Sequence, residues 1–560
     1  MAAAFMLEIR EKLAEALRQG IQRAKADGVF PPDCEETVKL ETPKDRTHGH
    51  FATNAALVLA RWAKKPPRQV AEMLLSYLPE VGFLGRTEIA GPGFINFYLD
   101  RSWLGEAAAE VLRLAEAYGD NDLLRGEKIQ LEFVSANPVG PMNVVNARAA
   151  AVGDSLARIF KTCGAQVEKE YYINDYGVQV WVLGRSIEAR YRELLGEAVE
   201  FPEEGYRGDY ITDLAQEVLA TYGSELRAKP EEERVELCKE FGYKKILRSQ
   251  QEDLKNYGIV YDVWFSERSL HQSGAVDKVI KELEAKGLLY EADGAIWLKT
   301  SLFGDDKDRV IRTADGRTTY FISDIAYHLN KYERNFTRVI DIWGPDHHGY
   351  IPRMKAAMAA LGIDPARLEV LIAQQINLLK GGKPFKMSKR RGEFITMQDL
   401  LNEVGNDAAR WYFLMRSTDS HLDFDLELAK AQTSENPVFY VQYAHARIAS
   451  LFRQAAEAGV AWQGWRPEDA ELWDDDEAEI LEQVARFPEL LITAAEGCEP
   501  HRVTGYLLEL ATLFHAYYNR KRFLGEGPEV SHARLSLAAV VQRILAKGLS
   551  LLGISAPERM

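Results

Sequence analysis

The sequence has few cysteines, no long apolar run and no excess of positive charge. Its four cysteines, Cys34, Cys163, Cys238 and Cys498, lie far apart and form no CxxC pair, so neither a zinc site nor a disulfide framework is predicted. No apolar segment reaches the ~18 residues that a membrane-spanning helix needs. The formal net charge of -15 argues against indiscriminate binding to nucleic acid, although a local basic stripe can still hold a specific RNA.

The chain is too long for one hydrophobic core. It has 560 residues, and single cores stop growing near ~250–300 residues. Residues 1–120 mix helical and alternating segments, which predicts an α+β domain. Residues 121–380 predict a parallel-sheet domain with a helical insertion around 178–257. Residues 381–435 contain a basic loop, and residues 436–560 have the periodicity of an all-helical domain.

The second region opens with a strand, a helix and a second strand. KIQLEFVSA, residues 128–136, and QVEKEYYIND, residues 166–175, predict strands around a helix at residues 147–164, an order that makes parallel sheets. The loop at residues 137–146 joins strand to helix, where backbone N–H groups and the helix dipole favour a phosphate. The loop has neither a Walker sequence nor GxGxxG. A nucleotide-dependent oxidoreductase, which also fits such a chain, is therefore disfavoured.

A short basic segment, KPFKMSKRRGEF, occupies residues 383–394. One interpretation is a solvated basic loop. The other is a loop whose ammonium groups neutralise a triphosphate as charge develops on it. The tetrapeptide Lys386-Met387-Ser388-Lys389 favours the second interpretation, because it is the KMSK signature of class I aminoacyl-tRNA synthetases.

Further segments resemble the arginyl-tRNA synthetases of bacterial type. In chain order they are IAGPGFINFYL, LEFVSANPVGP, GYRGDYI, TTYFISDIAYHLNK, WGPDHHGYIPRMKAA, NPVFYVQYAHAR and LLGISAPERM. The resemblance spans nearly the whole chain. It implies an α/β fold with a class I Rossmann-like parallel-sheet catalytic domain. It also implies an α+β N-terminal domain that contacts the tRNA elbow, a stem-contact region at residues 381–435 and an all-helical anticodon-binding domain.

The resemblance implies an enzyme, an arginine–tRNA ligase. Such an enzyme activates L-arginine with ATP and Mg²⁺ and transfers it to the 3′ end of tRNA(Arg). The implied partners are arginine, ATP and tRNA(Arg), with no membrane, and the implied form is a monomer in the cytoplasm. A sister synthetase for cysteine or another amino acid is the alternative. Glu132 with Asn137, the N-terminal domain and the lack of a zinc-type Cys/His set disfavour it.

The family's arginine-binding residues can be placed on this chain. The resemblance implies that the substrate is held by Glu132, Ser135, Asn137, Tyr320, Asp324 and Asp346. A guanidinium group presents a planar fork of donors, which carboxylates accept well. Asp324 has an alternative interpretation as a helix N-cap. Glu132 lies inside an apolar strand, where a buried carboxylate needs a cationic partner.

A second set of residues is implied to bind ATP. Its members are Pro141, Met142, Asn143, Asn146, His347, Lys386, Met387, Ser388 and Lys389. Asn143, Asn146, Lys386 and Lys389 are the implied catalytic residues within this set. His347 and His348 are adjacent but lack metal-ligand spacing, so no metal site is predicted.

The sequence departs from its class at the start of the first nucleotide-site helix. The class signature His-x-Gly-His is replaced by Asn143-Val144-Val145-Asn146. Asparagine keeps a donor at each end, whereas Val145 puts a branched side chain where glycine lets the adenine approach. An uncompensated loss of one such donor costs ~10²–10³ in rate. The hypotheses are an active synthetase with an asparagine-based site, or a tRNA-binding protein that adenylates poorly. The retained arginine-site residues and KMSK lysines favour the first.

Overall fold

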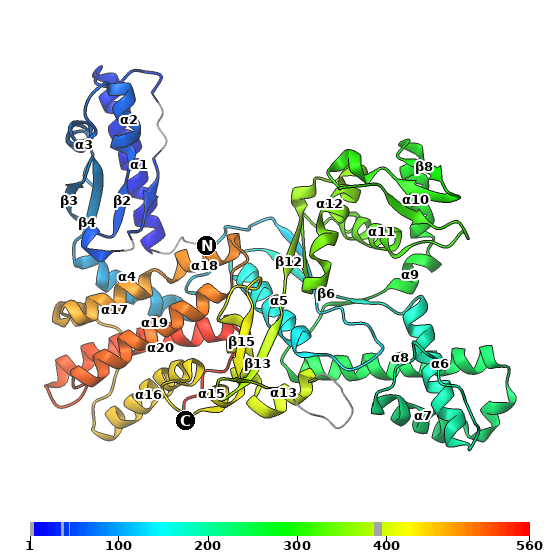
Figure 1. The fold of residues 1–560 in the computed structure, drawn as a ribbon. Helices are drawn as coiled ribbons and strands as arrows, with labels where there is room; N and C mark the ends of the chain where they lie inside the picture. The colour runs from blue at the N-terminus through cyan, green and yellow to red at the C-terminus, as the bar shows by residue number, and fades with distance from the viewer. Residues whose placement is uncertain (1–4, 35–37, 44, 386–394) are drawn as a thin grey trace.

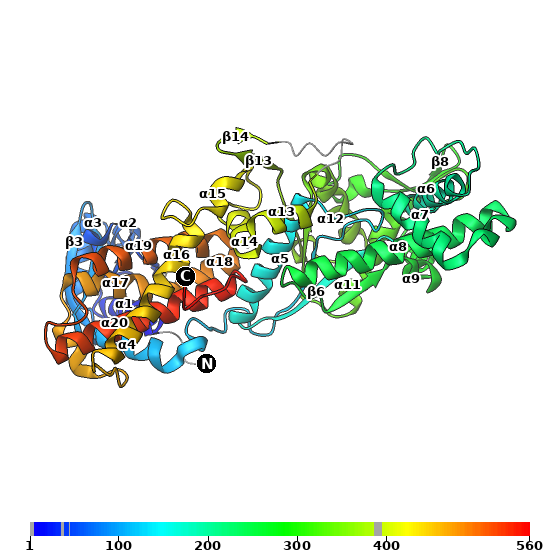
Figure 2. The ribbon, with the colours of Figure 1, turned by 90° about the horizontal axis from the view of Figure 1, so that it is seen from below.

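The computed structural model describes residues 5–34, 38–43, 45–385 and 395–560. The molecule is elongated (Figure 1). The N-terminal unit, in blue, and the C-terminal helices, in orange and red, lie together at one end. The central sheet and the segments inserted into it form the other end, and Figure 2 shows the same division from below. None of the described helices is long and apolar enough to cross a membrane.

The N-terminal unit is a four-stranded antiparallel sheet with helices packed on it. The strand order is β1-β2-β4-β3. Its elements are α1 (Phe5–Ala26), β1 (Leu40–Glu41), β2 (Phe51–Thr53), α2 (Ala55–Ala63), α3 (Pro67–Ser76), β3 (Leu84–Ala90), β4 (Phe94–Leu99) and α4 (Ser102–Leu114). Helix α1 buries Ile9, Leu13 and Leu17 on one side, the spacing expected of an amphipathic helix.

The central sheet has five parallel strands in the order β12-β11-β5-β6-β7. They are β5 (Lys128–Phe133), β6 (Gln166–Ile173), β7 (Val263–Ser266), β11 (Arg338–Trp343) and β12 (Leu368–Ile372). The predicted parallel sheet is confirmed. After β5 the chain adds β6 and β7 on one side of β5, and then adds β11 and β12 on the other side. The strand order therefore reverses between β5 and β11, and ligands of such sheets bind outside the carboxyl ends of the strands at that point.

Helices cover both faces of this sheet. Helix α5 (Val144–Thr162) shares a core with β5, whereas α11 (Tyr320–Glu333) and α12 (Ile351–Ala360) belong to a second core with Val339 and Leu368. Gly153 of α5 lies directly on the Phe133 ring, since a Cβ added there would stand 2.3 Å from Cγ of Phe133. Only glycine lets α5 approach the end of β5 so closely.

Two segments interrupt the sheet. Between β6 and β7 lie α6 (Val178–Leu194), α7 (Asp209–Tyr222) and α8 (Glu231–Asn256), which have a small core of their own. Between β7 and β11 lie α9 (Glu267–Gln272), α10 (Ala275–Ala285) and the antiparallel strands β8 (Leu289–Ala292), β9 (Ala295–Leu298) and β10 (Arg309–Arg312). Sequence analysis placed helices in the first segment but did not separate the second.

The chain then leaves the sheet for a helical end. The connecting region contains β13 (Ile376–Lys380), β14 (Lys383–Pro384), α13 (Met397–Val404), α14 (Asn406–Leu414), β15 (Leu422–Asp425) and α15 (Leu426–Lys430). The last helices are α16 (Pro437–Glu457), α17 (Asp475–Ala485), α18 (Phe487–Glu496), α19 (His501–Arg520) and α20 (Pro528–Leu551). No strand follows residue 436, and every residue from there to 560 is described. The predicted all-helical domain is confirmed.

A buried ion cluster joins the sheet to the helical end. Arg410 of α14 donates to Asp154 of α5 at 2.6 Å and to the carbonyl oxygen of Leu552 at 2.7 Å. Arg158 and Lys169 also donate to Asp154, at 2.9 and 3.0 Å. Burial would raise the pKa of the Asp154 carboxyl, but the three cations outweigh it and lower the pKa to about 2.

Replacing Asp154 with alanine should destabilise the protein by ~3–5 kcal/mol, because Arg410 would be left buried without its acceptor. Urea denaturation of the Asp154→Ala variant measures this. Since the folded-state pKa is depressed, the contribution is present above the unfolded pKa of about 3.8 and is lost as pH falls through about 2. The control is Asp122→Ala, which removes a carboxylate facing the well-exposed Arg125. Equal unfolding of the two variants would contradict the expected role of Asp154.

Candidate active site

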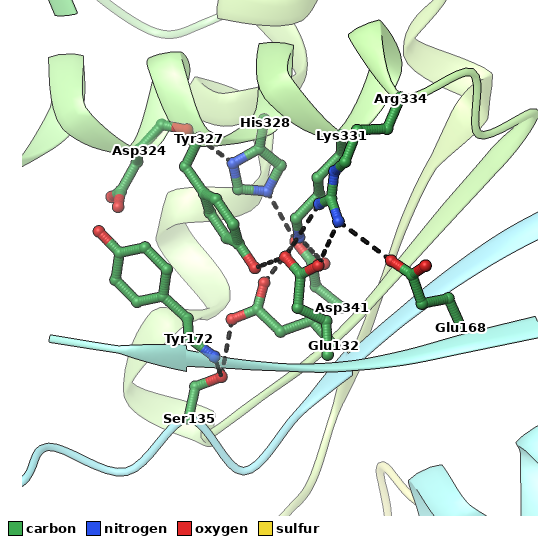
Figure 3. Close-up of polar contacts among 11 residues, drawn as sticks. Glu132, Ser135, Glu168, Tyr172, Asp324, Tyr327, His328, Lys331, Arg334 and Asp341 are labelled. Carbon is green, nitrogen blue, oxygen red and sulfur yellow. Dashed lines mark hydrogen bonds and ion pairs between the residues drawn. The ribbon is translucent and has the colours of Figure 1, made fainter. Parts of the chain in front are cut away.

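Two carboxylates stand side by side at the point where the strand order reverses. Glu132 of β5 and Asp341 of β11 are partners in the strand register, and both are buried. The ammonium group of Lys331, on α11, lies 2.6 Å from Oε2 of Glu132 and 2.8 Å from Oδ1 of Asp341 (Figure 3). The cation that a buried Glu132 requires is therefore supplied by the chain itself.

The local charges keep Lys331 and Asp341 ionised. Burial alone would lower the pKa of Lys331, but the charges of Asp341 and Glu132 outweigh it and raise the pKa. Burial would raise the pKa of Asp341, which Lys331 and His328 instead lower to about 2. His328 lies between two acceptors, with Nε2 2.7 Å from Asp341 and Nδ1 2.7 Å from the carbonyl oxygen of Asp324. This chain of contacts connects the sheet to the backbone of α11.

A second ion group continues along the same face of α11. Tyr327 donates to Glu170 of β6 at 2.6 Å. Arg334 donates to Glu170 at 2.6 Å and to Glu168 at 3.0 Å. Positions three and four residues apart share one helix face, so α11 is fixed to β5, β6 and β11 by one stripe of polar side chains (Figure 3).

The first turn of α11 borders a pocket beyond the carboxyl ends of β6 and β7. The pocket is lined by aromatic and polar side chains, among them Tyr176, Trp181, Glu267, His271, Tyr320 and Ser323. Tyr320 is 54% exposed, and Tyr176 stacks on His271 with ring centroids 3.9 Å apart. Since Tyr176 is itself 45% exposed, the rings of Tyr320 and Tyr176 are both accessible to a ligand.

Glu267 lines this pocket, and Asp324 directly follows the lining residue Ser323. Burial and the nearby charges of Asp324 and Asp175 raise the pKa of Glu267 to about 8. Burial also raises the pKa of Asp324, against the effect of the Tyr350 hydroxyl, which donates to it at 2.6 Å. Among the described residues, no Lys or Arg lies within 4 Å of either carboxyl group. Arg317 also lines the pocket, but it is paired with Asp315 at 2.6 Å. Carboxyl groups without such a partner suit a cationic ligand.

The start of α5 is capped by the side chains of two asparagines, Asn143 and Asn146. The side-chain oxygen of Asn143 accepts the N–H groups of Val145 and Asn146, at 2.9 and 3.0 Å. The side-chain oxygen of Asn146 accepts the N–H group of Asn143 at 2.9 Å, which completes a capping box. The N–H groups of Val145 and Asn146, at the helix start expected to favour a phosphate, are therefore occupied by Asn143. Both side-chain Nδ2 groups have no hydrogen-bond partner within the described part of the chain.

The chain that follows the KMSK signature lies against this helix start. Met397 donates its N–H group to the carbonyl oxygen of Met142 at 2.8 Å, and Thr396 forms a backbone bridge with Asn143. The signature residues themselves, Lys386, Met387, Ser388 and Lys389, lie outside the described residues. The described residues Thr396 and Met397 therefore lie at the start of α5.

Comparisons with known proteins cover the whole chain. The model of the arginyl tRNA synthetase N terminal domain matches residues 8–99. The model of the catalytic domain of class I (R) tRNA synthetases matches residues 110–442, and that of the DALR anticodon binding domain matches residues 441–560. The chain belongs to the arginyl-tRNA synthetase family.

Relatives of full length agree with this family. An arginine–tRNA ligase of Syntrophotalea carbinolica is 48% identical over 99% of both chains. One of Geobacillus kaustophilus is 46% identical, again over 99% of both chains. Among solved structures, the arginyl-tRNA synthetase of Thermus thermophilus has a TM-score of 0.75 at 23% identity, covering 98% of this chain and 100% of its own. This last likeness shows the shared fold.

The structure of this chain groups most of the residues expected to bind arginine. Ser135 donates to Glu132 at 2.8 Å, and Tyr320 and Asp324 lie one turn apart on α11. Thr319 is the N-cap of α11, so the alternative interpretation of Asp324 as an N-cap was wrong. Asp346 lies in the exposed turn after β11, at residues 345–350, beside His347 and His348.

Sequence reasoning missed two residues of this site. Glu267 directly follows β7, and an acidic residue at the end of a predicted strand would have been the signal. That strand has only four residues, which is too short for a clear period. Lys331 was part of the segment TTYFISDIAYHLNK. Its seven-residue spacing from Asp324 places both on one helix face, and this could have indicated it.

Replacing Lys331 with methionine should destabilise the fold by ~3–5 kcal/mol, because Glu132 and Asp341 would be buried without their cation. Thermal and urea denaturation measure the loss. The matched control is Lys278→Met, which removes an exposed ion pair with Glu333 and should leave unfolding unchanged. If both variants unfold alike, Lys331 does not hold α11 to the sheet.

Proposed function

We propose that this member of the family is an active arginine–tRNA ligase, which forms arginyl-adenylate from L-arginine and ATP and transfers arginine to tRNA(Arg). One observation carries the choice of amino acid. The Glu267 carboxyl group lines a pocket, the Asp324 carboxyl group follows the lining residue Ser323, and neither has a Lys or Arg within 4 Å among the described residues. A guanidinium group supplies the missing cation and a planar set of donors.

The arginine side chain is proposed to enter between α9 and α11. Asp324 and Glu267 accept its guanidinium hydrogens, and the exposed Tyr320 ring covers it. At the other end of the substrate, the hydroxyl oxygen of Ser135 and the side-chain oxygen of Asn137 accept hydrogen bonds from the α-ammonium group. Glu132 already pairs with Lys331 through Oε2, but each carboxylate oxygen can accept a further bond. We assign Asp346 to the outer rim of this site, because it is exposed beyond β11.

ATP is proposed to lie over the start of α5. Pro141, Met142 and His347 border the nucleotide, and the Nδ2 groups of Asn143 and Asn146 donate to its phosphates in place of imidazoles. The arginine carboxylate attacks the α-phosphorus in line with the leaving pyrophosphate, which forms a mixed anhydride. Lys386 and Lys389, with Met387 and Ser388 between them, neutralise the charge that develops on the pyrophosphate.

Magnesium is proposed to enter as part of the substrate MgATP. The described residues contain no group of three His, Cys, Asp or Glu side chains that could hold a metal ion. The donors for the cation are then the ATP phosphates and water, as Mg²⁺ commonly prefers. No step is assigned to a metal held by the protein.

The remaining regions are proposed to hold the tRNA. Residues 1–120 contact its elbow, residues 381–435 its stem and residues 436–560 its anticodon. Tyr443 of α16 is 37% exposed, and the Arg447 guanidinium lies 4.7 Å from its ring centre. Such an aromatic and cationic pair is suited to stack on unpaired bases.

We propose a monomer in the cytoplasm. The four cysteines form no disulfide and are buried, which agrees with a reducing compartment.

Charging of tRNA(Arg) with labelled arginine tests the activity directly. The unmodified protein should charge the tRNA, because the capping box keeps the start of α5 formed and both Nδ2 groups remain as donors. The comparison is the triple variant Asn143→His, Val145→Gly, Asn146→His. If only the triple variant charges tRNA, while both proteins bind it, the native asparagine motif disables adenylation.

Arginine affinity should depend on pH through Glu267. A guanidinium group binds the ionised carboxylate, and the pKa of Glu267 is raised to about 8 in the structure, which contains no ligand. The KM for arginine should therefore fall several-fold as pH rises from about 6.5 to 8.5. Glu267→Gln should raise the KM and flatten its pH dependence. The control is Glu333→Gln, which changes an exposed acid of α11. An unchanged pH profile in Glu267→Gln would exclude this residue from the site.

A further inference from the structure

The loop after β5, residues 134–141, has a backbone that its own sequence disfavours. Val134 and Ser135 have φ angles of +70° and +39°, in the left-handed region. Non-glycine residues seldom adopt this region, and β-branched residues such as valine least of all. Such a backbone persists only where the surrounding structure holds it. The loop contains Ser135 and Asn137, so its conformation decides where two proposed arginine contacts stand.

Side chains from outside the loop hold its carbonyl groups. At its start, Tyr261 donates to the carbonyl oxygen of Phe133 at 2.9 Å. In its middle, the Tyr171 hydroxyl lies 3.0 Å from the carbonyl oxygen of Ala136. These two tyrosines come from the sheet region. The rest of the loop is held by the helical insertion between β6 and β7.

Gln250 of α8 is the central residue of that contact. It is 1% exposed, and its Nε2 group donates to the carbonyl oxygens of Asn137 at 3.2 Å and Gly140 at 3.0 Å. Its Oε1 atom lies 3.0 Å from the Tyr171 hydroxyl. Both hydrogens of the amide are therefore donated to the loop. The single hydroxyl hydrogen of Tyr171 can be donated either to Gln250 or to Ala136, so the Nε2 group makes the fixed contacts with the loop. A buried amide that donates both of its hydrogens holds its neighbours in one arrangement.

Helix α7 adds a second contact from the same insertion. Tyr210 donates to the carbonyl oxygen of Val139 at 2.8 Å. The Val139 side chain packs against the core formed by α6, α7 and α8. The far half of the loop is thus attached to the insertion by both polar and apolar contacts.

We propose that Gln250, supported by Tyr210, is a positioning residue for the arginine site, and that the helical insertion between β6 and β7 holds the loop after β5 in place. Gln250 acts through the backbone of Asn137 and does not touch the substrate. The inference rests on the proposed role of Asn137. Misplacing a binding group by about 1 Å can cost ~10²-fold in rate, so loss of these hydrogen bonds should be visible in kinetics.

The test compares Gln250→Met with Gln251→Met. Methionine has a similar length and no amide, and Gln251, the next residue of α8, donates to none of the loop carbonyls. Arginine-dependent pyrophosphate exchange is measured with tRNA present. We expect Gln250→Met to raise the KM for arginine about tenfold or more, while the KM for ATP and the Kd for tRNA change less than about threefold. Gln251→Met should match the unmodified protein.

A third variant separates positioning from a purely structural role. In Gln250→Glu a carboxylate faces two carbonyl oxygens, and protonation restores one donor. Relative to the unmodified protein at each pH, its KM for arginine should improve as pH falls from about 8 to 6, because burial raises the pKa of a carboxyl group. A loss of stability alone would not give this dependence.

The outcomes are distinct. If the unmodified protein charges arginine and Gln250→Met keeps an arginine KM within twofold of Gln251→Met, the inference is wrong. If Gln250→Met fails to fold, Tyr210→Phe decides, since it removes only the hydroxyl that holds Val139. An arginine KM raised at least threefold in Tyr210→Phe supports the inference, and a smaller change overturns it. No charging by the unmodified protein would instead contradict the proposed function.

Discussion

The contact between Lys331 and the two carboxylates of Glu132 and Asp341 fixes α11, whose first turn borders the candidate active site. It lies where the strand order of the sheet reverses, and it fixes α11 across β5 and β11. Everything that α11 presents at its first turns, including Tyr320 and Asp324, takes its position from this contact. Breaking such a buried pair leaves an uncompensated charge, so α11 is held on β5 and β11 only when all three side chains are in contact.

The acidic residues around the site fall into two groups. Those behind the site, such as Glu170 and Asp341, are paired with cations of the chain itself. Glu267, which lines the pocket, and Asp324, next to the lining residue Ser323, have no Lys or Arg within 4 Å in the described ranges, and burial raises their pKa values. The first group holds the fold together, whereas the second group is available to the proposed arginine substrate.

Much of the fold could be predicted from the sequence, but the partners of individual side chains could not. The apolar run at β5 and its loop and helix predicted a parallel sheet, because both faces of such strands are buried. The strands β8, β9 and β10 have four residues each and carry no clear period. The pairing of Lys331 with Glu132 spans 199 residues, and the contact of Gln250 with the β5 loop spans more than 100. Local patterns do not encode such contacts.

The register of β5 and β11 has a consequence for folding. Glu132 and Asp341 face Lys331 only when the two strands pair as observed. Side chains alternate between the faces of a strand, so a slip of one residue would turn one carboxylate to the opposite face of the sheet, where α5 packs. A charge without a partner in that core is costly enough to make the slipped sheet unstable. Glu132 and Asp341 thus also favour the observed pairing of β5 with β11 over a pairing shifted by one residue.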